Sequence, residues 1–179
     1  MHDPHSHDHA QQGSHHEHKA QAPASVACFV VTSSDTRDDK TDESGQLICE
    51  LLEAAGHAVA GRALIKDEPA QLLDVLESLA PAAGARAVII SGGTGLGRRD
   101  TTVETLLPRL TKRLDGFGEL FRALSFAEIG SAAMMSRAVA GTLGGMIVFA
   151  LPGSPAAARL ALTRLVLPEL GHAVREMTR

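Results

Sequence analysis

The chain has 179 residues and a formal net charge of -4, with 44% hydrophobic and 21% charged residues. This balance is typical of one globular domain and excludes wholesale disorder. The acidic net charge argues against non-specific binding to nucleic acid, and a chain without Trp or Tyr has little aromatic surface for stacking on bases.

The first boundary is compositional. Residues 1–22 contain seven of the nine histidines and almost no apolar side chains, which predicts a disordered His-rich tail before a domain over residues 23–179. The tail either binds Zn or Ni loosely through its imidazoles or has no role in the main activity. No apolar run approaches the roughly 18–20 residues that span a bilayer, and no signal peptide is recognisable, so a cytoplasmic location without membrane contact is expected.

From Pro23 onward, strand patterns alternate with helix patterns. A nearly continuous apolar run at residues 24–32 predicts a buried strand. Helical spacing follows at residues 47–55, where Gly56 offers a stop. A weaker strand over residues 59–65 leads to a helix that begins near Pro69. His57, in the turn between them, is predicted to be a solvated loop residue.

The second half continues in the same way. Residues 87–90 are short and wholly apolar, which predicts another buried strand, and residues 146–151 predict a fourth. Helical character is expected over residues 102–110, 116–124, 132–140, 156–167 and 168–177. Strands that alternate with amphipathic helices predict a three-layer α/β fold, in which helices cover both faces of a mainly parallel sheet.

The segments that directly follow the strands carry the polar residues. They are rich in Gly, hydroxyls and carboxylates, and they comprise residues 33–37, 67–68, 91–102 and 152–155. In an open parallel sheet these segments leave from the same edge, so we expect them to converge in space. Helix starts with unpaired N–H groups at that edge favour an anion such as phosphate.

The Gly-rich segment over residues 91–102 matches neither common nucleotide motif. The dinucleotide fingerprint fails because Arg98 stands where its third Gly is required, and the P-loop fails because Arg98 and Arg99 replace Lys and Ser/Thr. What remains is a glycine cluster through which backbone amides approach a ligand, followed by two arginines and Asp100. The alternative is a tight turn whose arginines lie in solvent.

Asp67 and Asp100 are the candidate metal-binding carboxylates. Mg²⁺ is typically held by one or two carboxylates together with substrate phosphates, and phosphoryl or nucleotidyl transfer depends mainly on such positioning. Either aspartate could instead simply cap the helix that follows it.

Several blocks together resemble the MoaB/Mog family of molybdenum cofactor biosynthesis proteins, over about residues 26–176. The blocks that carry the resemblance are the Gly-rich stretch Ser91–Gly95 with Arg99 and Asp100, and the stretches at residues 116–122, 128–133, 136–137, 149–154 and 167–172. The chain departs from the family pattern at three positions, where Glu43 replaces a frequent Lys, Ser91 a usual Thr, and Val103 a common Pro.

The resemblance implies a molybdopterin-binding fold, a homo-trimer or homo-hexamer, and an adenylyltransferase that converts molybdopterin to adenylyl-molybdopterin with ATP and Mg²⁺, releasing pyrophosphate. Asp67 and Asp100 match the family's two catalytic aspartates, which are also the expected Mg²⁺ ligands. The implied molybdopterin and phosphate contacts are Ser33, Asp35, Ser91, Gly92, Gly93, Thr94, Gly95 and Arg99. On the nucleotide side the resemblance implies Gly153 and Ser154. The alternative is a non-catalytic molybdopterin-binding or delivery protein whose tail handles metal.

Overall fold

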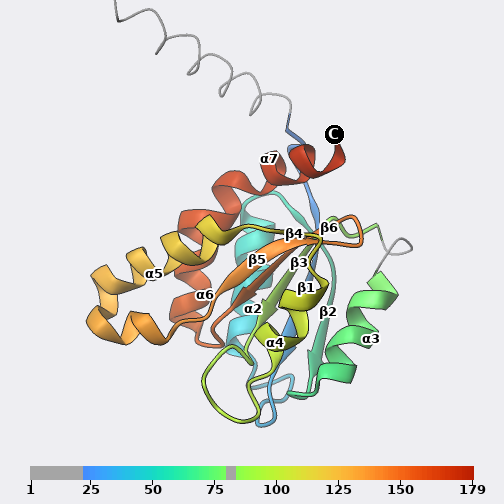
Figure 1. Ribbon diagram of the computed structural model, residues 1–179. Helices are drawn as coiled ribbons and strands as arrows, with labels where there is room; N and C mark the ends of the chain where they lie inside the picture. The colour runs from blue at the N-terminus through green and yellow to red at the C-terminus, as the bar shows by residue number, and fades with distance from the viewer. Residues whose placement is uncertain (1–21, 80–83) are drawn as a thin grey trace, which may run out of the picture.

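The computed structural model describes residues 22–79 and 84–179, so the predicted tail lies outside the described residues except for Ala22. The described residues form a six-stranded sheet in the order β2-β1-β3-β6-β5-β4 (Figure 1). The first four of these strands are parallel, and they are β2 (Ala58–Ile65), β1 (Ala27–Ser33), β3 (Ala87–Ser91) and β6 (Met146–Leu151). The antiparallel edge consists of β5 (Val139–Leu143) and β4 (Lys112–Arg113).

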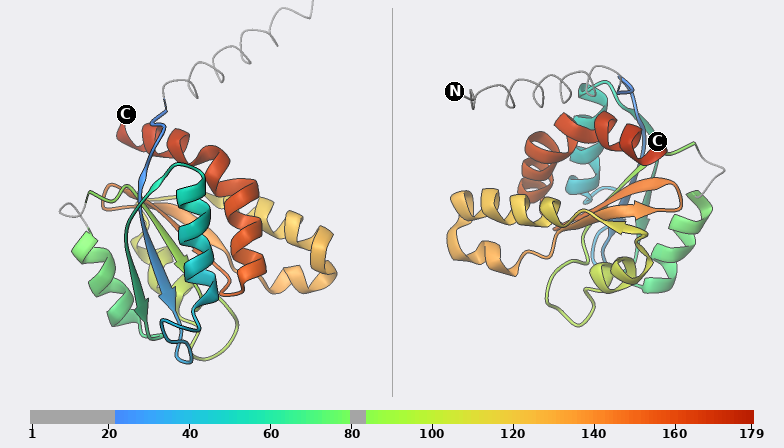
Figure 2. Two further views of the ribbon diagram at one scale, coloured as in Figure 1. Left: turned by 180° about the vertical axis from the view of Figure 1, so that it is seen from behind. Right: turned by 45° about the horizontal axis from the view of Figure 1, so that its top comes forward.

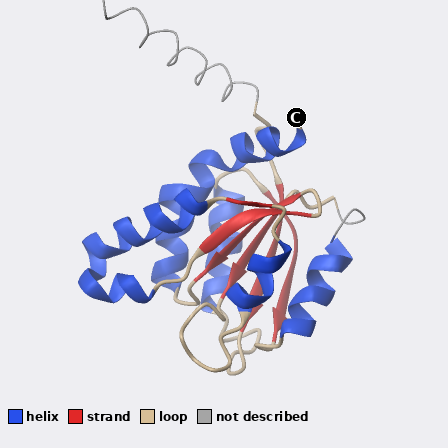
Figure 3. Cartoon of the chain, in the orientation of Figure 1, coloured by secondary structure: helices blue, strands red, loops and turns tan. Residues whose placement is uncertain are grey.

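Helices cover both faces of the sheet, which confirms the predicted three-layer α/β fold (Figures 2 and 3). One face packs against α2 (Glu43–Ala54), α5 (Asp115–Ile129), α6 (Pro155–Ala161) and α7 (Leu167–Thr178). The other face packs against α3 (Pro69–Leu79) and α4 (Thr102–Leu106). A π-helical segment at Leu162–Val166 joins α6 to α7, so the two helices predicted at the C-terminal end form one nearly continuous rod.

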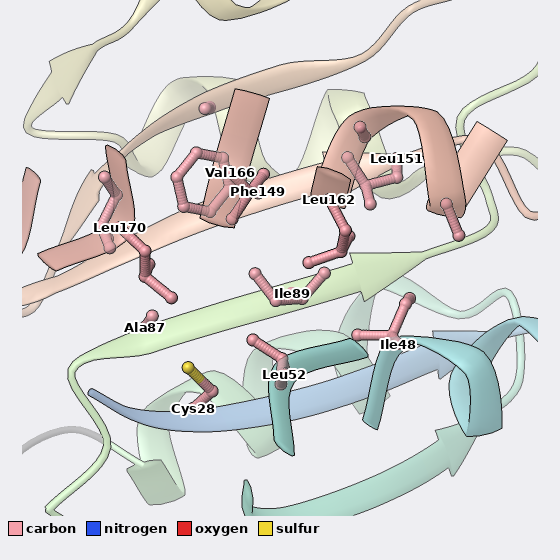
Figure 4. Packing of buried hydrophobic residues seen from close by; sticks show 14 of the residues in the cluster. Cys28, Ile48, Leu52, Ala87, Ile89, Phe149, Leu151, Leu162, Val166 and Leu170 are labelled. Atoms are coloured by element: carbon pink, nitrogen blue, oxygen red, sulfur yellow. The ribbon is translucent and has the colours of Figure 1, made fainter. Parts of the chain in front are cut away.

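The strands supply both cores by simple alternation. Successive side chains of a strand point to opposite faces, so Ile89 packs toward α2 and α6 while Ile90 packs toward α3 and α4. Phe149 and Val148 divide between the two faces in the same way. Figure 4 shows Ile48 and Leu52 of α2 meeting Ile89 across the larger core. This burial on both faces explains why the parallel strands read as continuous apolar runs.

The helix predicted over residues 132–140 is wrong. A 3-10 helix occupies Gly130–Met135, and residues 139–143 form β5, which pairs with β6 through the two-residue turn at Gly144 and Gly145. Both glycines have positive φ, the geometry of a tight hairpin turn with the right twist. A Gly-Gly pair between apolar runs is a hairpin signal that outweighs the helical content of the preceding residues.

His57 is part of the packed domain rather than a solvated loop residue. Its Nδ1 accepts a hydrogen bond from the backbone N–H of Val26 at 3.2 Å, next to the start of β2. Burial lowers the pKa of this imidazole below its ordinary value of 6.5. The folded chain therefore favours the neutral ring, which keeps Nδ1 available as an acceptor.

His57→Gln should reduce the acid sensitivity of the domain. Because the pKa of His57 is lower in the folded state, the unfolded chain binds more protons, and the stabilising contribution present above the ordinary pKa is lost as pH falls. Urea unfolding of both proteins at about pH 8 and about pH 5.5 checks this. The variant should lose less free energy of unfolding between the two conditions, and an equal loss in both proteins would contradict the assignment.

Candidate functional site

A cleft of about 520 Å³ lies at the carboxyl ends of the four parallel strands. Segments far apart in the sequence meet there, as expected for an open parallel sheet, at the lower edge of the sheet in Figure 1. The lining residues are Thr32–Ser34, Thr36, Arg37, Asp67, Ser91–Gly95, Asp100, Met135, Ser136 and Pro152–Ser154. All the predicted site residues except Asp35 and Arg99 line this cleft.

The Gly-rich loop passes unusually close to the end of β1. Gly92 and Gly93 have φ values of 104° and 63°, and a Cβ atom on Gly92 would overlap the carbonyl oxygen of Ser33. Thr102 closes the loop, since its Oγ1 donates to the Gly92 carbonyl and its N–H donates to the Gly93 carbonyl, both at 3.0 Å. Next to the loop, the Ser91 hydroxyl is buried and has no hydrogen-bond partner among the described residues. Ser91 lines the cleft, and the hydrogen-bonding capacity of its hydroxyl is not used by any of these residues.

Gly92→Ala should destabilise the domain by about 2–3 kcal/mol, because the new Cβ meets backbone in a left-handed conformation. Gly116→Ala is the matched control, since a Cβ at this helical position meets nothing within 4 Å and Ala favours helix by about 0.5–1 kcal/mol. Chemical denaturation of both variants measures the difference. Equal stability of the two variants would show that a Cβ atom at position 92 fits beside the carbonyl oxygen of Ser33 without strain.

Asp67 joins the end of β1 to the end of β2. Its Oδ1 accepts a hydrogen bond from Ser33 Oγ at 2.7 Å, and its Oδ2 accepts one from the backbone N–H of Asp35 at 3.1 Å. These contacts hold the carboxylate at the cleft, and they come from the segment after β1 rather than from the first turn of α3. The interpretation of Asp67 as a helix cap is therefore replaced by one in which it connects two loops of the site.

Asp100 folds back over the Gly-rich loop. Its Oδ2 accepts a hydrogen bond from the backbone N–H of Gly97 at 2.8 Å, while Thr101 occupies the N-cap position of α4. A Cβ on Gly95 would lie only 2.8 Å from the same oxygen, so the glycine leaves room for the carboxylate. Asp67 and Asp100 thus line the same cleft, Asp67 next to Gly93 and Asp100 next to Gly95.

Asp35 and Arg99 bind each other at the rim instead of lining the cleft. Arg99 Nε lies 2.9 Å from Asp35 Oδ2, and its Nη2 lies 2.7 Å from Glu68 Oε1. The guanidinium holds the pKa of Asp35 below its usual range, and the two carboxylates raise the pKa of Arg99. These ion pairs connect the loops that follow β1, β2 and β3, and so they hold the three loops together at the rim of the cleft.

Two arginines that were not among the predicted site residues also contribute to the site. Arg37 lines the cleft and donates from Nη2 to the carbonyl of Gly153 at 2.8 Å. Arg137 donates from Nε to the carbonyl of Thr94 at 3.0 Å and pairs with Glu104. The sequence does offer one indication for Arg37, because this residue ends the polar segment that follows the first strand. Its partners come from distant segments that no spacing rule connects.

The carboxylates of the cleft suit a metal ion that arrives with its substrate. Among the described residues, no group of three or more His, Cys, Asp or Glu side chains could enclose a metal by itself. Asp67 and Asp100 are hard oxygen donors at one cleft, the set that Mg²⁺ uses when phosphate oxygens and water complete its coordination. Within residues 22–79 and 84–179, no helix has the length and apolar content required to cross a membrane.

Comparison with known proteins assigns the chain to a family. Residues 28–172 match the family model described as a probable molybdopterin binding domain. The molybdenum cofactor biosynthesis protein B of Halalkalibacterium halodurans is 49% identical over 90% of this chain and 95% of its own length, and the Bacillus cereus protein of that name is 48% identical over 91% and 97%. A crystal structure of a molybdenum cofactor biosynthesis protein B superposes with a TM-score of 0.84 at 47% identity, over 89% of this chain and 99% of that one. The chain therefore belongs to the molybdopterin-binding domain family that includes the molybdenum cofactor biosynthesis proteins B.

Proposed function

We propose that this protein acts in molybdenum cofactor biosynthesis by binding molybdopterin and adenylylating it with ATP and Mg²⁺. The observation that carries the proposal is the composition of one cleft. It combines a glycine loop open to close backbone approach, the unpartnered Ser91 hydroxyl, and the carboxylates of Asp67 and Asp100. Together these groups supply donors for a phosphate and ligands for the cation that neutralises it.

In the proposed arrangement, the terminal phosphate of molybdopterin lies against the segment from Ser91 to Gly95, which Ser33 flanks from the end of β1. The nucleotide lies on the side of Gly153 and Ser154. Asp67 and Asp100 would hold Mg²⁺, which when bound neutralises charge on the phosphates. Asp35 and Arg99 support this site from the rim, where their ion pair orders the loops that carry the phosphate contacts.

The bond changes follow from this placement. An oxygen of the molybdopterin phosphate attacks the α-phosphorus of ATP and forms a new phosphoanhydride bond, while the bond from the α-phosphorus to the α–β bridging oxygen breaks. The electron pair of that bond leaves with pyrophosphate. The protein contributes chiefly by holding both phosphates in line, which is the principal requirement of such a transfer.

The assembly is part of the same proposal. Large apolar side chains are exposed on α5 and the 3-10 helix that follows it, namely Leu120, Phe126, Ile129, Met134 and Met135. Figure 1 shows this segment extending away from the sheet. An exposed apolar group of this kind marks an interaction surface, and we propose that it joins copies of the chain into a homo-trimer or homo-hexamer. Light scattering that shows a monomer at working concentration would contradict this.

Incubation of the full chain with purified molybdopterin, ATP and Mg²⁺ tests the proposed activity, with the product identified by its mass. Adenylyl-molybdopterin should appear only when Mg²⁺ is present. Tight binding of molybdopterin without any product would instead show a binding or delivery protein. The same assay on a chain lacking residues 1–22, with zinc uptake measured separately, shows whether the His-rich tail has an independent role in metal handling.

A further inference from the structure

Arg37 carries the cationic charge of the cleft. Among the described residues that line this cleft, it is the only one with a Lys or Arg side chain, while Asp67 and Asp100 are both acidic. Arg99, the cation expected from the sequence, does not line the cleft and pairs with Asp35 and Glu68 at its rim. A site with two carboxylates and a phosphate-bearing ligand needs positive charge beyond one metal ion, and Arg37 is placed to provide it.

The guanidinium of Arg37 is held from two distant segments. Its Nη1 donates to Ser44 Oγ at 2.5 Å, in the first turn of α2, and its Nη2 donates to the Gly153 carbonyl at 2.8 Å, in the turn after β6. These hydrogen bonds use two of the five N–H groups of a guanidinium. The side chain keeps 28% of its surface exposed, so it is oriented yet still reaches solvent.

A buried carboxylate lies behind this arginine. Asp42 is fully buried, and its Oδ1 lies 3.7 Å from Arg37 Nη1 while its Oδ2 lies 3.4 Å from Arg62 Nη2. Thr32 Oγ1 donates to Oδ2 at 2.7 Å, and the Gly45 N–H donates to Oδ1 at 3.0 Å. Asp42 is hydrogen-bonded to both β1 and α2, so its carboxylate is held in a fixed position. The carboxylate therefore orders the guanidinium of Arg37 before any ligand binds.

We propose that Arg37 binds the phosphate oxygens of the ligand on the Gly153 side of the cleft. The ligand class is a phosphate ester or anhydride, which a guanidinium recognises through two parallel hydrogen bonds. Under the proposed function this phosphate belongs to the nucleotide, since Arg37 is tied to the turn assigned to the nucleotide side. The identity of the phosphate therefore rests on the proposed function, whereas the binding of phosphate by Arg37 rests on the contacts above.

Two substitutions at Arg37 separate its charge from its shape. Arg37→Gln removes the charge, and Arg37→Lys keeps the charge but loses the fork that reaches both Ser44 and Gly153. Arg62→Gln is the matched control. Arg62 also pairs with Asp42 and is 24% exposed, but it does not line the cleft. Arg62→Gln, like Arg37→Gln, deprives Asp42 of one positively charged partner, but it leaves the cleft lining unchanged.

Calorimetric titration of each full-length protein with Mg·ATP alone and with molybdopterin alone measures the effect. Arg37→Gln should weaken binding of Mg·ATP by about 10-fold or more, the range for a lost hydrogen bond to a charged group, and Arg37→Lys should weaken it less. Arg62→Gln should stay within about twofold of the unmodified protein. Thermal unfolding confirms that each variant is folded, and Arg37→Lys serves as the test if Arg37→Gln is not.

The outcomes separate the two proposals. Unchanged affinity of Arg37→Gln for both ligands, or equal losses in Arg37→Gln and Arg62→Gln, would overturn the role of Arg37. A loss confined to molybdopterin would keep phosphate binding but overturn its assignment to the nucleotide. If the unmodified protein forms no adenylyl-molybdopterin while Arg37→Gln still weakens ligand binding, the proposed reaction fails and the role of Arg37 stands.

Discussion

Asp100→Ala is expected to lower the rate of adenylyl-molybdopterin formation by about 100-fold or more, equivalent to about 2.7 kcal/mol of transition-state stabilisation. The carboxylate lines the cleft beside the Gly-rich loop, where under the proposed function it holds the cation that neutralises the reacting phosphates. The fold should survive, because the side chain makes one hydrogen bond among the described residues, to the Gly97 N–H, in a loop outside both cores. Turnover at saturating ATP and molybdopterin measures the first effect, and chemical denaturation measures the second.

Asp74→Ala provides the control for this experiment. Asp74 is an exposed carboxylate on α3, so its removal changes the net charge by the same amount without touching the cleft. Its turnover should match that of the unmodified protein. Near-normal turnover of Asp100→Ala would remove this residue from the mechanism, and equal losses in the two variants would reduce the effect to net charge. Asp100→Asn, which keeps the shape of the side chain, should lose activity nearly as completely as Asp100→Ala.

Asp42→Ala should lower the free energy of unfolding by about 3 kcal/mol. Its carboxylate is fully buried and serves both as the N-cap of α2 and as the partner of two guanidinium groups. Removing one partner of a buried ion pair typically costs about 3–5 kcal/mol, and the partial exposure of Arg37 and Arg62 favours the lower end of this range. Chemical denaturation gives the value directly.

Asp39→Ala tests whether burial is the reason. Asp39 pairs with the same Arg62 at 3.4 Å, but its side chain is 89% exposed. Because solvent screens such a pair, its loss should change the free energy of unfolding by about 0.5 kcal/mol or less. If the two variants were equally stable, the buried network around Asp42 would contribute no more than an ordinary surface ion pair. Thr32→Val, which removes one donor to Asp42, should fall between them at about 1 kcal/mol.

The sequence by itself determined the four parallel strands and the edge where the site lies, but not the antiparallel strands β5 and β4. Apolar runs such as the one that contains Ile89 and Ile90 predict strands buried on both faces, because burial on both faces leaves no polar alternation. Parallel strands bring their carboxyl ends to one edge, so the segments that contain Asp67, Asp100 and Gly92 converge at a single cleft. These inferences depend only on local patterns and on the topology of α/β units.

Only the tertiary structure decided which charged side chains enter the cleft. The sequence places Arg99 beside Asp100 in the Gly-rich loop, yet Arg99 turns to Asp35 and Glu68 at the rim. Arg37 faces the cleft because its partners, Ser44 and Gly153, come from separate segments that the fold brings together. Ion pairing depends on distance and on exclusion of water, and neither quantity can be read from spacing along a chain.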